Sequence, residues 1–469
     1  MQRHIRKAET KTPIRPTSVV TEQSNAATGL KEKYGQIVLV LQGGGALGAY
    51  QVGVYQALHE AGIEPDWVIG TSIGAINGAL IVGNPLAARL ERLNAFWTRV
   101  EQSPLVGFAS QLPLLGVLPN WSTLAAGVSG FFRPNPLAFL GINVPLSADG
   151  AGYYSTQPLA ETLSELIDIA ELNTGGTRLS IGAANLHTSE MRYFDTREGE
   201  LSIKHIMASG ALPPAFPPVR IDGQLYWDGG ILSNTPVEAV FDDKPRQNSL
   251  LFVVHLWNPE GPEPETMRQV MHRQKELQYC SRAMSHIQRQ RQIHRLRHIV
   301  AELAARLPES ERAAREVGEL AAYGCMTRMH VVRLLAPMIE GEDHTKDIDF
   351  SASGIRRRRE AATRMADACW NRNRGKATSI HMKASSCTRF PRPTRPCDLA
   401  SGDVSVAAKL RRHRNDGSRL RAFREHGDVQ WPELSADRRW QLALLGCLRF
   451  PVSAWQRLNR CRHLSIPTG

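Results

Sequence analysis

The chain has 469 residues, enough for one large domain with extensions or for several domains of average size. Its 42% hydrophobic and 22% charged content is ordinary for a globular protein, and it lacks the uninterrupted apolar run of about 18 residues that a membrane-spanning helix requires. The formal net charge of +12 arises in residues 351–469, which hold 25 Lys and Arg against 9 Asp and Glu, whereas residues 1–350 are mildly acidic. The basic character is therefore a property of the tail and does not make the whole chain a nucleic-acid binder.

The N-terminal residues 1–34 are basic, rich in Pro and Thr, and lack the apolar core of a secretory signal. We predict that they form a disordered arm. The seven cysteines show no C-x-x-C spacing, which favours free thiols in a reducing compartment. Together these observations predict a cytoplasmic protein.

A regular pattern begins with Gln36–Leu41, an apolar run of strand length that is followed by several glycines. Ala46–Ala61 has helical spacing, Trp67–Ile69 is a second short apolar run, and Ile73–Val82 is again helical. This order of strand, glycine turn, helix, strand and helix is typical of the start of a parallel sheet with helices on its faces.

An apolar insertion is predicted at residues 102–148, in which Arg133 is the only charged residue. We interpret it either as a hydrophobic region packed on the core or as a lid or lipid-docking surface. The α/β pattern resumes at Arg178–Ala184, and Ser249–His255 is the last predicted strand, which we expect to close the sheet.

Two further regions are predicted after the sheet. Residues 263–370 are charged and helical in texture, and we interpret them as a helical extension in which Arg356–Arg359 forms an exposed helix face. His272 and His294 are likewise assigned to solvated helix faces. Residues 371–469 form a basic, cysteine-containing tail without periodicity, which we interpret as disordered; a nucleic-acid or anionic-lipid binding arm and a translated frameshift are alternative hypotheses.

The strongest local signal is the run Gly70-Thr71-Ser72-Ile73-Gly74, which lies between a predicted strand and a predicted helix. A nucleophile elbow places its serine at such a turn. Gly70 and Gly74 are small enough to let the strand and the helix pass close together. The N-terminus of the following helix adds a partial positive charge that favours an oxyanion.

A second signal is the glycine run Gly43-Gly44-Gly45-Ala46-Leu47-Gly48, which ends the first predicted strand and opens a helix. Its backbone amides suit either the pyrophosphate of a dinucleotide or the oxyanion of an acyl-transfer intermediate. A ribose-binding acid belongs at the carboxyl end of the second strand, but Asp66 lies directly before that strand. Ser72 lies at the carboxyl end instead, which favours an oxyanion hole.

The third signal is Asp228, which is followed by two glycines and would by itself indicate only a turn. Taken in chain order, the glycine run, the G-x-S-x-G serine and the Asp-Gly-Gly resemble the motifs of the patatin-like phospholipases. The Pro-rich segment Ala208–Pro218 resembles the family's segment before its aspartate. The resemblance covers residues 36–256 well.

The resemblance implies a patatin-like three-layer α/β/α sandwich with a mostly parallel central sheet, in a catalytic domain at residues 35–262. It further implies Ser72 as the nucleophile and Asp228 as the general base. The resemblance implies that the backbone amides of Gly43, Gly44 and Gly45 form the oxyanion hole. It also implies that five further glycines support the motifs: Gly48, Gly70, Gly74, Gly229 and Gly230.

The implied activity is lipid acyl hydrolysis, as a phospholipase A or esterase, through a covalent acyl-enzyme. We expect a lipid substrate, peripheral membrane contact, no specific nucleic acid, and neither metal nor cofactor. Three alternatives stay open: an esterase or thioesterase with non-lipid substrates, a noncatalytic or nucleotide-binding protein that uses the glycine run, and a Ser-Asp-His triad completed by His255.

Overall fold

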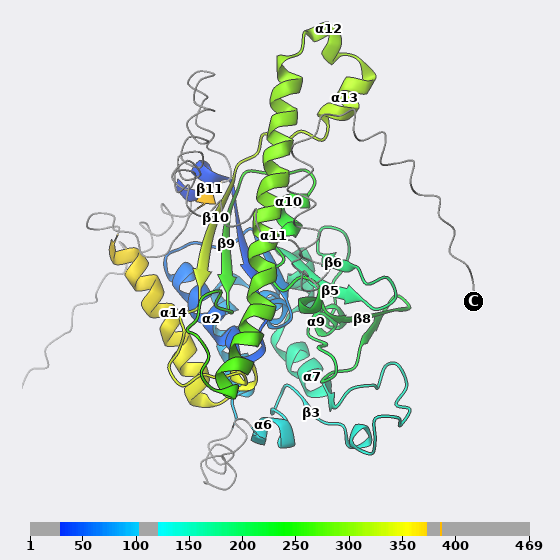
Figure 1. Ribbon diagram of the computed structural model, residues 1–469, viewed down its shortest axis with the longest axis vertical. Coiled ribbons are helices and arrows are strands. Elements are labelled where there is room, and N and C mark those ends of the chain that lie inside the picture. Colours follow the sequence, from blue (N-terminus) through cyan, green and yellow to red (C-terminus); the bar gives the residue numbers. More distant parts are fainter. Residues whose placement is uncertain (1–28, 103–120, 373–384, 387–469) are drawn as a thin grey trace, which may run out of the picture. The chain divides into compact units, whose positions relative to one another are not determined.

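A mixed sheet of nine strands organises the residues that this computed structural model describes, which are 29–102, 121–372 and 385–386. Five neighbouring strands, β10, β9, β1, β2 and β5, run parallel, and β8, β7 and β6 join antiparallel beyond β5 (Figure 1). The α/β class with a mostly parallel sheet is thereby confirmed. The strands are β1 (Gln36–Leu41), β2 (Trp67–Thr71), β5 (Arg178–Asn185), β6 (Met191–Asp195), β7 (Val219–Ile221), β8 (Gln224–Asp228), β9 (Ser249–His255), β10 (Met329–Leu335) and β11 (Ser385–Ser386).

Helices cover both faces of the sheet, which gives the predicted three layers. Alternate residues of β1 point to opposite faces: Leu39 and Leu41 pack against α2, α3, α4 and α14, while Val38 and Val40 pack against α10 and α11. Because both faces are covered, the central strands are almost wholly apolar. These helices are α2 (Ala49–Glu60), α3 (Ile73–Val82), α4 (Arg89–Arg99), α10 (Glu238–Asp242), α11 (Met267–Arg306) and α14 (Ala352–Arg372).

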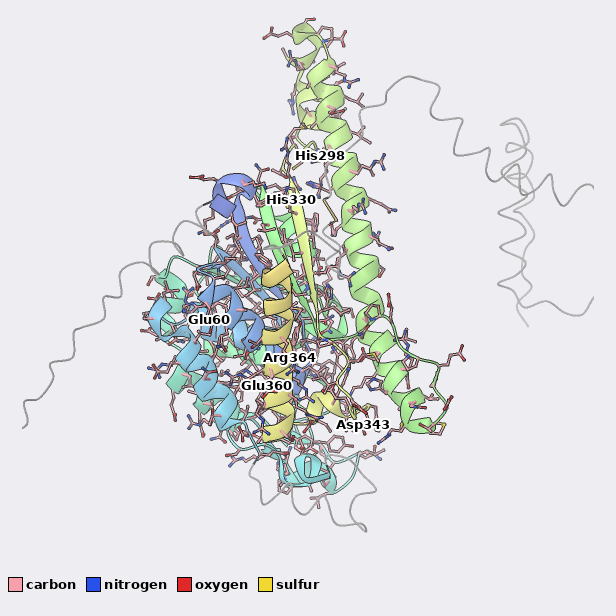
Figure 2. All side chains as sticks on the ribbon, turned by 90° about the vertical axis from the view of Figure 1, so that its left-hand side faces the viewer. Glu60, His298, His330, Asp343, Glu360 and Arg364 are labelled. Carbon is pink, nitrogen blue, oxygen red and sulfur yellow. The ribbon has the colours of Figure 1, made fainter. Side chains whose placement is uncertain are left out.

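The remaining elements are short or lie away from the centre of the sheet. The second half of α11 runs on beyond the strands to α12 and α13 (Figures 1 and 2). Within the described residues, no helix is both long and apolar enough to cross a membrane. These elements are α6 (Trp121–Ala126), β3 (Arg133–Pro134), β4 (Tyr154–Ser155), α7 (Gln157–Leu166), α8 (Ile169–Thr174), α9 (Ile203–Ser209), α12 (Glu309–Arg312) and α13 (Arg315–Ala321).

The expectation that β9 closes the sheet is wrong, because β10 pairs with it in parallel from Met329 to Leu335. This strand was missed because His330 and Arg333 interrupt its apolar residues within a charged, helix-like stretch. Only three of its seven residues, Met329, Val331 and Leu334, are buried, as suits a strand near the sheet's edge. Part of the predicted helical extension therefore belongs to the central sheet, whereas the domain boundary predicted at residue 262 stays a prediction.

Regular structure begins a few residues before the predicted end of the disordered arm at residue 34. Residues 29–34 are helical, and Lys31 forms an ion pair with Asp66 at 2.6 Å. Residues 1–28 lie outside the described residues. Of the predicted tail, the described part comprises only the end of α14 and β11, so the hypotheses on its disorder, ligands and reading frame stay predictions.

Candidate active site

Ser72 lies at the sharp turn between β2 and α3, at the carboxyl edge of the parallel strands. Its backbone has φ 57° and ψ −127°, a region that L residues rarely adopt, so the turn is strained in the way that nucleophile elbows are. A Cβ at Gly70 would collide with the backbone of Gly74, and a Cβ at Gly74 would collide with the carbonyl oxygen of Leu41. The two motif glycines are therefore required by the close approach of strand and helix.

A second serine fixes this turn. The backbone amide of Ser72 donates to Ser209 Oγ at 2.9 Å, and Ser209 Oγ donates to the carbonyl oxygen of Gly182 at 2.6 Å. Ser209 is fully buried at the end of α9. It lies in the Pro-rich segment noted in the sequence, but nothing in that segment indicated this role.

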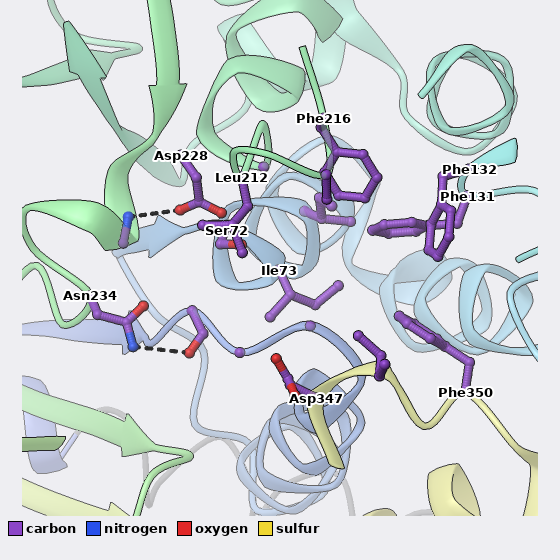
Figure 3. A pocket seen from close by; sticks show the side chains of 18 of the residues that line it. Ser72, Ile73, Phe131, Phe132, Leu212, Phe216, Asp228, Asn234, Asp347 and Phe350 are labelled. Carbon is purple, nitrogen blue, oxygen red and sulfur yellow. Dashed lines mark hydrogen bonds between the residues drawn. The ribbon is translucent and has the colours of Figure 1, made fainter. Parts of the chain in front are cut away.

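Asp228 ends β8 and faces Ser72 across the site (Figure 3). Its side chain is 2% exposed, accepts a hydrogen bond from the Gly230 amide at 2.7 Å, and lies beside the Ser72 side chain in the same pocket. Burial raises the pKa of the Asp228 carboxyl to about 6, against the opposing effects of the nearby Ser72 hydroxyl and the Gly230 amide. The carboxyl is thereby a better proton acceptor than an exposed aspartate would be.

The glycine loop, residues 43–48, connects β1 to α2 beside Ser72. The Gly43 amide donates to the carbonyl oxygen of Asn234 at 3.2 Å, so it is already occupied. The backbone amides of Gly44 and Gly45 have no hydrogen-bond acceptor among the described residues. Gly45 has φ +54°, a left-handed conformation that glycine adopts without cost.

Two residues that sequence reasoning missed hold the carbonyl oxygen of Gly43. Asn234 donates to it through its side-chain amide at 3.2 Å (Figure 3), and Trp257 donates through Nε1 at 3.0 Å. Both residues are buried. Asn234 lies shortly after the Asp-Gly-Gly motif, but only its position in space reveals the contact.

A mainly apolar pocket opens beside these groups. It brings together Ser72, Asp228 and the three glycines of residues 43–45. The wall next to Ser72 consists of apolar side chains, and it includes two residues of the predicted apolar insertion. Those lining residues are Ile73, Ile76, Phe131, Phe132, Tyr154, Leu212 and Phe216 (Figure 3).

Comparisons with known proteins agree with this geometry. Residues 39–241 match the family model described as patatin-like phospholipase, and residues 277–376 match a second model described as patatin phospholipase. The chain belongs to the patatin-like phospholipase family. The roles that the resemblance implies for Ser72, Asp228 and the glycine loop stay predictions, and the structure places these residues around one pocket.

Curated relatives include the lysophospholipase nte1 of Aspergillus niger, 25% identical over 261 residues, and lysophospholipase NTE1 of Debaryomyces hansenii, 27% identical over 199 residues. The first match covers 50% of this chain and 14% of the relative, and the second covers 42% and 10%. The chain therefore spans only a small part of the length of these relatives.

Solved structures with some likeness are VipD from Legionella pneumophila and the type III effector protein ExoU. The VipD match has a TM-score of 0.29 and 16% identity, and it covers 71% of this chain and 67% of that chain. For ExoU the TM-score is 0.26, the identity is 15%, and the coverage is 72% and 53%.

The patatin-like site has a further wall that the sequence did not lead us to expect. Asp347, Ile348 and Phe350 line the pocket, although they follow Ser72 by more than half of the chain's length. Asp347 lies directly beside the glycine loop (Figure 3). Nothing local in this segment, which follows β10, indicates an active-site role.

The histidine of the alternative triad lies elsewhere. His255 is 1% exposed, does not line the pocket, and accepts a hydrogen bond through Nε2 from Arg333 Nε at 3.3 Å. Burial, with a smaller effect of the Arg333 charge, lowers the pKa of His255 to about 3 and keeps the ring neutral. The ribose-binding alternative is also disfavoured, since Asp66 accepts from the Ile37 amide at the opposite end of the strands.

The predictions of exposed helix faces fail at His294 and at Arg358, whereas Arg356 and Arg357 are exposed as expected. His294 is fully buried, and its Nε2 lies 3.2 Å from Nε2 of His298, one turn along α11 and close to β10 (Figure 2). In the run Arg356–Arg359, the third side chain, Arg358, is 2% exposed. Both errors arise because a polar residue was assumed to face water, whereas long-range packing supplied it with partners.

Among the described residues, no cluster of three or more His, Cys, Asp or Glu side chains could hold a metal ion. Cys280 and Cys325 are buried free thiols.

Proposed function

We propose that this protein is a lipid acyl hydrolase that cleaves carboxylic esters with Ser72 as nucleophile and Asp228 as base. The observation that carries the proposal is the position of the Ser72 side chain beside a buried Asp228 carboxyl, in a mainly apolar pocket that is also lined by the glycines whose amides we expect to hold the oxyanion (Figure 3). The lysophospholipase relatives support a lipid ester as the substrate class.

In the first step Ser72 Oγ attacks the ester carbonyl carbon while Asp228 accepts the hydroxyl proton. The carbonyl oxygen becomes an oxyanion within reach of the Gly44 and Gly45 amides and the N-terminus of α2, which stabilise its negative charge. The intermediate then collapses, the C–O bond to the alcohol breaks, and Asp228 returns the proton to the leaving alkoxide.

In the second step water attacks the acyl-enzyme. Asp228 accepts a proton from the water, and the resulting tetrahedral intermediate expels Ser72 Oγ, which takes that proton back. The products are the free fatty acid and a regenerated Ser72–Asp228 pair. No histidine and no metal enter this scheme.

The surroundings of the pocket also favour contact with a lipid surface. The loop at residues 136–142 exposes four large apolar side chains, and residues 134–148 carry no charge. Phe139 lies 5.4 Å, between ring centroids, from Tyr153 and 6.5 Å from Tyr154, which in turn contacts Phe132 of the pocket at 5.0 Å. We propose that this loop docks the protein on a bilayer next to the pocket mouth. The four side chains are Leu137, Phe139, Leu140 and Ile142.

Fatty-acid release from phosphatidylcholine vesicles and from p-nitrophenyl esters, both without calcium, tests the proposal. Wild type should hydrolyse both, and Ser72→Ala should hydrolyse neither. Exchanging Phe139, Leu140 and Ile142 for Gln should reduce vesicle binding and vesicle turnover but not turnover of the soluble ester. Leu320→Gln, at an equally exposed site on α13, is the matched control and should bind vesicles normally.

Turnover of soluble esters alone would support the alternative of a non-lipid esterase or thioesterase. Absence of any hydrolysis and of labelling by a fluorophosphonate at Ser72 would contradict an enzyme and favour a noncatalytic protein. The cytoplasmic location favoured by the sequence stays a prediction.

A further inference from the structure

The segment at residues 342–350, which follows β10, is in direct contact with the glycine loop. A Cβ at Gly45 would collide with the carbonyl oxygen of Asp347, so the two backbones touch. Gly45 therefore has to be glycine for two independent reasons, its left-handed φ and this close approach. An element far along the chain thus packs on the loop whose glycines line the pocket.

Arg358 on α14 joins the two segments. Its guanidinium is 2% exposed and donates to Glu342 Oε1 at 2.9 Å, to Asp349 Oδ2 at 3.2 Å and to the carbonyl oxygen of Asp349 at 2.8 Å. It also donates to the carbonyl oxygen of Ala46, inside the glycine loop, at 3.4 Å. The buried Arg358 guanidinium therefore binds Glu342 and Asp349, near the two ends of the 342–350 segment, and also the glycine loop.

A second set of charges anchors the same segment to α11. Lys275 donates to Asp347 Oδ1 at 2.5 Å and to the carbonyl oxygen of His344 at 3.0 Å. Lys346 forms a buried ion pair with Glu276, and its ammonium lies 5.2 Å from the ring centre of Trp257, the residue that donates to Gly43. The glycine loop is thus held at Gly43 through Trp257 and at Ala46 through Arg358.

We propose that residues 342–350 act as a clamp on the glycine loop and that Arg358 is the positioning residue that holds this clamp in place. The inference rests on the proposed function, because the clamp matters only if the Gly44 and Gly45 amides stabilise an oxyanion. Arg358 does not line the pocket, so it acts through the loop. Loosening the loop weakens an interaction made mainly in the transition state, so kcat falls while KM is nearly unchanged.

The test compares Arg358→Met with Arg89→Met, a matched control. Arg89 is also buried and donates to Glu64, Asn84 and Thr177, at the amino end of the strands and far from the site. Both substitutions remove a buried, hydrogen-bonded cation, and both should lower Tm. Only Arg358→Met should lower kcat for a p-nitrophenyl ester, by about 10-fold to 100-fold per folded molecule.

A second measurement keeps this inference separate from the proposed function. Amide hydrogen exchange in the peptide that covers residues 42–48 should become faster in Arg358→Met and stay at the wild-type rate in Arg89→Met. This readout needs no catalysis, so it decides on the clamp even if wild type hydrolyses no ester. If Arg358→Met does not fold, Asp349→Asn and Glu342→Gln are tested in its place, because each weakens one ion pair of the Arg358 guanidinium. Both should accelerate exchange and lower kcat as Arg358→Met would, but by smaller amounts.

The clamp is supported if exchange in residues 42–48 accelerates and kcat falls at nearly constant KM in the Arg358, Asp349 or Glu342 variants. It is overturned if these variants lose only Tm, as Arg89→Met does, with unchanged loop exchange and unchanged kcat.

Discussion

Asn234 and Gly43 are joined by two hydrogen bonds, each 3.2 Å long: the Gly43 amide donates to the Asn234 carbonyl, and the Asn234 side chain donates to the Gly43 carbonyl. This pairing ties the chain after Asp228 to the glycine loop. The proposed base Asp228 and the proposed oxyanion donors Gly44 and Gly45 therefore belong to one connected unit, although they lie 184 and 183 positions apart in the sequence.

We expect Asn234→Ala to lower kcat about tenfold, because the loop loses one of its ties and the Gly44 and Gly45 amides lose their fixed positions. The loss in free energy of unfolding should be only about 1 kcal/mol, since Trp257 still donates to the Gly43 carbonyl. Steady-state kinetics and urea denaturation measure both quantities.

Asn84→Ala is the control for this prediction, because Asn84 is equally buried and its side chain donates to the carbonyls of Leu80 and Leu166 away from the site. It should lose stability without losing kcat. Equal loss of kcat in the two variants would mean that Asn234 acts only on stability.

The strained backbone at Ser72 predicts a difference between two inactive variants. Ser72→Gly and Ser72→Ala both remove the hydroxyl, but only glycine adopts φ 57° and ψ −127° without strain. The glycine variant should therefore unfold at a higher urea concentration than the alanine variant, and its free energy of unfolding should be larger by about 1 kcal/mol. The reverse order would show that the elbow is not strained in solution.

The raised pKa of Asp228 predicts an acid limb in the pH profile. Because the base must be ionised, kcat/KM should fall as the pH decreases through about 6, following a single ionisation. In the proposed dyad, the ionisation of Asp228 alone explains this loss of kcat/KM at low pH, without a titrating histidine. A profile that stays flat down to pH 4 would mean that Asp228 titrates at its ordinary value or is not the base.

The same pKa shift has a consequence for stability. The folded state raises the pKa of Asp228 from 3.8 to about 6, so it binds this proton more tightly than the unfolded chain does. The stabilisation is present below pH 3.8 and is lost as the pH rises through about 6. Asp228→Asn should therefore gain stability over wild type at pH 8, on the order of 3 kcal/mol, and little at pH 4. Urea denaturation at the two pH values measures this difference.

The sequence predicted the parts of this site that depend on local structure. A strand, a sharp turn and a helix around Ser72 follow from the spacing of apolar residues and glycines over some twenty positions, and the aspartate follows from the family resemblance. The Gly43 amide was also assigned to the oxyanion hole, but its bond to Asn234 excludes it from that role in the mechanism proposed here.

What the sequence did not reveal depends on packing between distant segments. Ser209, Trp257 and Arg358 carry no local pattern that marks them, since their partners lie far away in the chain. Strand β10 was missed because two polar residues, His330 and Arg333, interrupt it, so the uninterrupted apolar run that identified β1 is absent.

The most direct test of the Ser72–Asp228 dyad is the initial rate of p-nitrophenyl ester hydrolysis by Ser72→Ala, Asp228→Asn and His255→Gln, with fluorophosphonate labelling of each variant located by mass spectrometry. We expect Ser72→Ala to be neither active nor labelled, Asp228→Asn to lose about 10²-fold to 10⁴-fold in kcat, and His255→Gln to keep the wild-type kcat and the label on Ser72. Loss of activity in His255→Gln together with survival of Asp228→Asn would contradict the dyad and make His255 the base.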